Sequence, residues 1–95
     1  MHRLQPARLE LEATVDLGKT AGDQELPYIS GLTFLPDGRV VAVDHMNDKC
    51  NVLSATLVRL GSGYQFQAPP YDVTCFNGDS LAVTLGFVFY TMYCF

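Results

Sequence analysis

The densest group of polar side chains in this sequence is formed by Asp44, Asn47 and Asp48. Their oxygen atoms are of the kind that binds calcium. An EF-hand loop beginning at Asp44 would need an oxygen ligand at its third position and glycine at its sixth, where this chain has Met46 and Lys49. Carboxylate and amide side chains also bond nearby backbone N–H groups in turns. We therefore interpret Asp44 and Asn47 as structural turn residues and expect no metal site.

His45 is a second residue whose type could do chemistry, as a general base. A catalytic histidine needs a nucleophile within reach and a partner that orients its ring. The sequence has no Gly-x-Ser-x-Gly nucleophile motif, and no phosphate-binding loop, dinucleotide fingerprint or metalloprotease motif. We expect His45 to lie in an exposed turn, and the chain to be no enzyme and to need no cofactor.

Tyr71 and Asp72 follow two consecutive prolines, Pro69 and Pro70. Aromatic residues are enriched at the energetic centres of protein interfaces, although most buried ones simply pack in a core. Tyr71, Asp72 and His45 are the candidate partner-binding residues, and core packing of Tyr71 is the simpler alternative.

The three cysteines, Cys50, Cys75 and Cys94, are far apart and odd in number. Zinc sites need closely spaced ligands, and small disulfide-stabilised domains are denser in cysteine. The pattern favours free thiols in a reducing compartment, so we expect a cytoplasmic protein.

Charge and hydropathy limit the kinds of partner. The chain of 95 residues has six Lys and Arg, ten Asp and Glu, and a formal net charge of −4, which disfavours nucleic acid because phosphate binding needs a basic surface. Residues 80–95 carry no charge, but this run is shorter than the roughly 20 residues of a membrane-spanning helix. We expect no membrane segment and a protein partner.

The remaining sequence predicts short strands separated by turns. Residues 8–17 alternate between apolar and polar side chains, which predicts a strand with one buried face, and a polar loop follows at 18–27. Further strands are predicted over 29–35, 39–44, 50–54, 57–60, 64–66, 71–76 and 80–85. The glycine-rich segment 61–63 is expected to be a turn between two of them.

Two of the turns have clear sequence signals. Pro36, Asp37 and Gly38 combine a preset backbone angle, a side-chain acceptor and a residue that tolerates positive φ. Asn77 and Gly78 form an Asn-Gly pair, which is a strong hairpin signal. We therefore assign Asp37, Gly38, Asn77 and Gly78 as structural turn residues.

An internal repeat decides among the all-β architectures. Segments 32–43 and 73–83 share the order of apolar strand, short turn and strand ending in Ala-Val. Val73 follows Leu32 by 41 positions and Val83 follows Val43 by 40, so the second copy is expected to lose one residue in its turn. A period of about 40 residues with four strands is typical of propeller blades. The sequence thus predicts an all-β fold with antiparallel sheets, forming about two blades of an incomplete β-propeller.

Residues 29–49 resemble an NHL-type blade, with Val43-Asp44, then Asn47, then the basic Lys49 in the places where that family has a similar pattern. The second copy is a weaker match, with Thr84 taken as the counterpart of Asp44. The resemblance implies a six-bladed propeller, such as those at the C-terminal end of tripartite-motif ubiquitin ligases, where they bind protein or RNA partners. No RING finger or B-box pattern is present.

These observations divide the chain into four parts: residues 1–28 as a preceding strand and loop, 29–68 as a first blade, 69–85 as the start of a second blade, and 86–95 as a divergent apolar tail. The abrupt loss of charge suggests that this tail is not native blade sequence. The leading function is a protein-interaction module, the partner-reading end of a ubiquitin-ligase-type protein, which needs further blades or another chain to complete its ring. The alternatives are a fragment of a metal-dependent six-bladed hydrolase of the gluconolactonase type and a non-functional truncated product.

Overall fold

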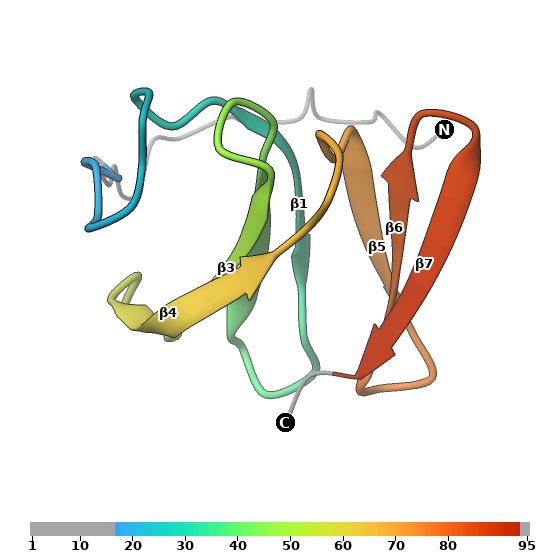
Figure 1. Cartoon of the computed structure of the whole chain (residues 1–95). Coiled ribbons are helices and arrows are strands. Elements are labelled where there is room, and N and C mark those ends of the chain that lie inside the picture. The colour runs from blue at the N-terminus through green and yellow to red at the C-terminus, as the bar shows by residue number, and fades with distance from the viewer. Residues whose placement is uncertain (1–16, 94–95) are drawn as a thin grey trace, which may run out of the picture.

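The computed structural model describes residues 17–93, which fold into two antiparallel β-sheets (Figure 1). The first sheet has its four strands in sequential order: β1 (Ile29–Phe34), β2 (Val40–Asp44), β3 (Lys49–Leu53) and β4 (Arg59–Gln65). The second has β5 (Asp72–Phe76), β6 (Ser80–Leu85) and β7 (Val88–Tyr93). The prediction of an all-β fold with antiparallel sheets is confirmed. The predicted strand at 8–17 falls, except for its last residue, outside the described residues.

The described part of the chain has no helix that is long and apolar enough to cross a membrane.

The first hairpin of each sheet has the same register. Leu32 lies opposite Ala42, and Val73 lies opposite Val83, so the two hairpins correspond at a constant offset of 41 positions. The expected loss of one residue in the second turn is therefore wrong. The Ala-Val pair present in both copies suggested this loss, but Ala42 corresponds to Val83 and not to Ala82.

The sheets differ instead in their second connection. Four residues, 45–48, join β2 to β3, whereas Gly86 and Phe87 alone join β6 to β7. The constant offset also makes Leu85, rather than Thr84, the counterpart of Asp44. The polar turn after Asp44 therefore has no equivalent in the second sheet.

The glycine-rich segment 61–63 lies inside β4, where a turn between two strands was expected. Gly61 and Gly63 have φ values of 67° and 78°, and the pairing with β3 is irregular between Cys50 and Val52. A bulge of this kind absorbs positive φ without ending a strand. The prediction of separate strands at 57–60 and 64–66 is therefore wrong.

The aromatic run near the C-terminus forms β7, which pairs with β6 from Val88 opposite Leu85 to Tyr93 opposite Ser80. Aromatic and β-branched side chains favour extended backbone, and no proline interrupts the run. The second sheet thus extends beyond position 85, where the sequence analysis divided the start of the second blade from a divergent apolar tail.

The two sheets meet along β1 and β5, which run side by side (Figure 1). The Ser30 hydroxyl donates to the Pro70 carbonyl (3.0 Å), and the Thr33 hydroxyl accepts a hydrogen bond from the Cys75 amide (3.3 Å). Residues further along β1 contact residues further along the segment that contains β5, so the two strands run in the same direction. A single core fills the space between the sheets and contains Leu35, Val41, Val43, Cys50, Phe66, Val73, Leu81, Val83 and Leu85.

Gly31 allows the close approach of β1 and β5. A Cβ atom at this position would lie 2.9 Å from the Asp72 Cα atom and 3.2 Å from the Val73 amide nitrogen. Real Cβ atoms essentially never approach other heavy atoms within 3.0 Å, so any side chain here would push the sheets apart.

An ion pair fastens the loop before β1 to β3. The Lys49 ammonium lies 2.5 Å from one Asp23 oxygen and donates to the Thr20 hydroxyl at 2.8 Å. Both charged side chains are almost fully buried. Burial alone would raise the pKa of Asp23, but hydrogen bonds from Lys49 and Thr20, together with the Lys49 charge, hold that pKa below its usual 3.8.

We expect Asp23→Asn to destabilise the chain at neutral pH and to have little effect in acid. A carboxylate with a lowered pKa in the folded state stabilises the fold above its unfolded pKa, and this stabilisation is lost as pH falls through the folded value. The window therefore lies below about pH 4. Thermal unfolding at pH 7 and at about pH 2.5, inside that window, measures the effect, and Glu25→Gln in the same loop is the control. An equal loss at both pH values would contradict the prediction.

Candidate partner-binding site

The turn after β2 is held by the Asp44 carboxylate, which is completely buried. Its Oδ1 atom accepts hydrogen bonds from the backbone amides of Tyr28 (3.0 Å), Met46 (3.1 Å) and Asn47 (3.3 Å). The Asn47 side-chain amide donates to its Oδ2 atom at 2.8 Å. One carboxylate thus fixes both the 45–48 turn and the residue that precedes β1.

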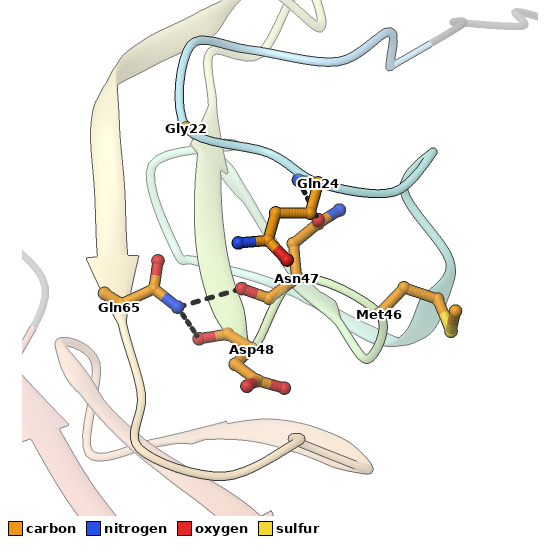
Figure 2. Close-up of a pocket in the computed structure, with 6 residues that line it drawn as sticks. All are labelled: Gly22, Gln24, Met46, Asn47, Asp48 and Gln65. Carbon is orange, nitrogen blue, oxygen red and sulfur yellow. Dashed lines mark hydrogen bonds between the residues drawn. The ribbon is translucent and has the colours of Figure 1, made fainter.

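Asn47 connects this turn to the preceding loop. Its side-chain oxygen accepts from the amides of Gln24 (3.2 Å) and Glu25 (3.1 Å), and its side-chain nitrogen donates to the Glu25 carbonyl (3.0 Å). Figure 2 shows the Gln65 amide donating to the carbonyls of Asn47 (2.9 Å) and Asp48 (3.1 Å). A polar cavity of about 180 Å³ remains, lined by Gly22, Gln24, Met46, Asn47, Asp48 and Gln65. The hydrogen bonds of the Asn47 and Gln65 side chains thus hold the turn and its neighbouring loop in place.

An aromatic pocket lies on the other side of the same turn, where the two sheets meet. Its volume is about 540 Å³, and it is lined by Tyr28, Ile29, Ser30, His45, Met46 and Tyr71. The His45 ring packs against Tyr71 with centroids 4.9 Å apart and meets the edge of Tyr28 at 6.3 Å. Tyr28, Met46 and Tyr71 are exposed, and no charged side chain lines the pocket. This arrangement can receive an apolar or aromatic side chain from a partner.

His45 is held in place across the sheet junction. Its Nδ1 atom lies 3.0 Å from the Pro70 carbonyl oxygen, which also accepts the Ser30 hydroxyl. A carbonyl oxygen can only accept, so this contact assigns the hydrogen of neutral His45 to Nδ1 and leaves Nε2 as an acceptor. His45 is half-buried rather than freely exposed. It can therefore offer a partner one directed hydrogen-bond acceptor.

The structure brings together two of the three predicted partner-binding residues, His45 and Tyr71. Asp72 does not line the pocket. Its Oδ1 atom accepts from the Val73 amide at 2.8 Å, and the residue packs against Gly31. Asp72 is thus part of the sheet junction beside the pocket.

Sequence reasoning missed Tyr28 and Met46 as pocket residues. A signal for Tyr28 was available in the first hairpin, because its register places the residue before β1 beside the residue after β2. The His45 amide does donate to the Tyr28 carbonyl, at 2.8 Å. No comparable signal exists for Met46, whose place follows from the shape of the turn.

The other predicted turn residues lie at the opposite ends of β1 and β5. Asp37 Oδ1 accepts from the Arg39 amide at 3.0 Å, and this bond, with the Arg39 side chain, lowers the pKa of Asp37. Gly38, Asn77 and Gly78 have φ values of 91°, 51° and 81°. The two hairpin tips line one open pocket. Each of these four residues shapes the turn in which it lies.

Among residues 17–93, no three His, Cys, Asp or Glu side chains come together to hold a metal ion. Cys75 is a free thiol, and Cys94 lies outside the described residues. No family model, no curated protein and no solved structure matches this chain.

Proposed function

We propose that this chain is a protein-interaction module, about two blades of an incomplete NHL-like β-propeller, that binds a protein partner through the aromatic pocket. The blade interpretation is supported by the parallel packing of β1 beside β5 and by the constant 41-residue offset of the two hairpins. Repeated blades stand side by side around one axis, so equivalent strands run in the same direction. A sandwich of two unrelated sheets has no reason to keep such a correspondence.

The observation that carries the binding proposal is the cluster of the exposed Tyr28 and Tyr71 rings with the half-buried His45 ring at the junction of the sheets. Exposed aromatic rings around a concave site are typical of interface hot spots. The hydrogen bonds of Asp44 and His45 hold these rings in position before a partner binds, which lowers the entropy cost of association. We infer an extended peptide segment of the partner, with one apolar or aromatic side chain entering the pocket.

We expect peptides selected on the full chain from a phage-displayed random library to lose at least about tenfold in affinity on Tyr71→Ala, because a hot-spot truncation costs more than about 1.4 kcal/mol. Fluorescence anisotropy with the selected peptides measures the change. Tyr64→Ala is the matched control, since Tyr64 is an equally exposed tyrosine on β4.

Circular dichroism checks that both variants keep the fold. Selected peptides that bind Tyr71→Ala as tightly as the unchanged chain, or a selection that yields no binding peptide, would refute the proposed site.

A further inference from the structure

The aromatic pocket is anchored to both sheets. The Tyr28 amide donates to the Asp44 carboxylate (3.0 Å), and the Tyr28 carbonyl accepts from the His45 amide (2.8 Å). The Tyr71 amide donates to the carbonyl of Thr84 on β6 at 2.8 Å. The two tyrosine rings are therefore carried by backbone that is bonded to different sheets, and these bonds exist before a ligand arrives.

The three rings of the pocket stand at steep angles to one another. The planes of Tyr28 and His45 are inclined by 70°, and those of His45 and Tyr71 by 58°. Rings arranged in this way form walls instead of a stack, and a further aromatic ring can meet them edge to face, as aromatic pairs prefer. The volume of about 540 Å³ lies within the roughly 300–1,000 Å³ of ligand pockets. The pocket thus has the shape and the room for one aromatic side chain.

The polar atom with a fixed role in this pocket is Nε2 of His45. The Pro70 carbonyl keeps the hydrogen of the neutral ring on Nδ1, so Nε2 accepts and does not donate. Nε2 has no hydrogen-bond partner among the described residues and is still open to solvent. The hydroxyls of Tyr28 and Tyr71 differ from it, because they rotate and can donate or accept. The Ser30 hydroxyl already donates to the Pro70 carbonyl.

We propose that the side chain entering the pocket is a tryptophan of the partner, and that His45 selects it by accepting a hydrogen bond from the indole N–H. This inference rests on the proposed function and names the chemistry of its ligand. An indole is an aromatic ring whose only polar group is a donor, which matches an uncharged aromatic pocket with one fixed acceptor.

The same acceptor discriminates against other side chains. Once a ring covers His45, Nε2 loses its contact with water, and a ligand without a donor leaves it unpaired. A site that hydrogen-bonds its ligand rejects an analogue that lacks the bonding group, so phenylalanine and leucine are disfavoured. Tyrosine also brings a donor, but its oxygen carries lone pairs for which the pocket has no fixed donor.

The test changes one group of the ligand and leaves the protein unchanged. In a peptide selected on the full chain, the anchor is the residue whose change to alanine costs affinity only while Tyr71 is present. Peptides with tryptophan, 3-benzothienylalanine or phenylalanine at the anchor are compared by fluorescence anisotropy. The benzothienyl ring has the shape of indole, with sulfur in place of the N–H. Tryptophan should bind at least about tenfold more tightly than either, a difference of about 1.4 kcal/mol.

A variant of the protein tests the other half of the hydrogen bond. His45→Phe keeps an aromatic ring and removes the acceptor, so the tryptophan and benzothienylalanine peptides should bind it alike. Tyr64→Ala removes an exposed tyrosine of β4 that does not line the pocket, and this control should keep the full preference for tryptophan. Circular dichroism checks that both variants fold. The comparison of peptides on the unchanged chain does not depend on either variant.

Equal affinities of the tryptophan and benzothienylalanine peptides for the unchanged chain would overturn the inference. A preference for tryptophan that persists in folded His45→Phe would overturn it as well. If Tyr71→Ala still weakens the same peptides, the proposed binding site stands and only its selectivity is lost. If Tyr71→Ala has no effect, or if no peptide is selected, the proposed site fails and this inference fails with it.

Discussion

Gly63→Ala is expected to lower the free energy of unfolding by about 3 kcal/mol or more. Gly63 has a φ of 78°, a region where a Cβ atom costs about 1–2 kcal/mol. A Cβ atom at this position would also overlap the carbonyl oxygen of Cys50 on the neighbouring strand. Because that oxygen belongs to backbone, the overlap is relieved only by moving β3 and β4 apart.

Gly61→Ala separates the two effects. Gly61 lies in the same strand with a φ of 67°, but a Cβ atom there would meet nothing within 4 Å. This variant should lose only the conformational part, about 1–2 kcal/mol. Urea unfolding followed by circular dichroism gives both values. Equal losses in the two variants would show that β3 and β4 do not approach as closely as described.

Asp44→Ala is expected to destabilise the chain by about 3 kcal/mol, since hydrogen bonds to a charged group contribute roughly 1.5–3 kcal/mol and buried donors left without acceptors cost more. The buried carboxylate accepts from the amides of Tyr28, Met46 and Asn47. The variant should also bind the selected peptides more weakly, because Tyr28 loses the bond that positions it. Chemical unfolding and fluorescence anisotropy measure these two effects.

Two variants serve as controls for Asp44→Ala. Asp37→Ala removes an exposed carboxylate from another turn and should leave peptide affinity unchanged. Asp44→Asn keeps one oxygen acceptor in the same place, so it should lose less stability than Asp44→Ala. If Asp44→Ala and Asp37→Ala were equally stable, the buried hydrogen bonds would not have the role given to them.

The fold was largely predictable because its hairpins depend on local chemistry. The strands on either side of Asp37-Gly38 and Asn77-Gly78 are bounded by residues that favour a turn by themselves, and both hairpins form as expected. The segment 61–63 misled the prediction because glycines with positive φ occur in bulges as well as in turns. Only pairing with a neighbouring strand, here β3, distinguishes a bulge from a turn.

The site was less predictable than the fold. Asp44 and Asn47 do lie in a hydrogen-bonded turn, and the local spacing of the two residues suggested this. The meeting of His45 with Tyr71 depends instead on how the second sheet docks against the first, through the Pro70 carbonyl. No pattern within either segment contains that information, because the two residues are brought together by contacts between sheets.

The packing of β1 beside β5 has a consequence for the order of folding. Neighbouring strands within each sheet are joined by two to five residues, whereas Ser30 reaches Pro70 across 40 positions. The entropy cost of closing a loop rises with its length, so the hairpins are favoured to form before the sheets meet. Until they meet, Val43 and Val83, which end up buried in the core between the sheets, face water.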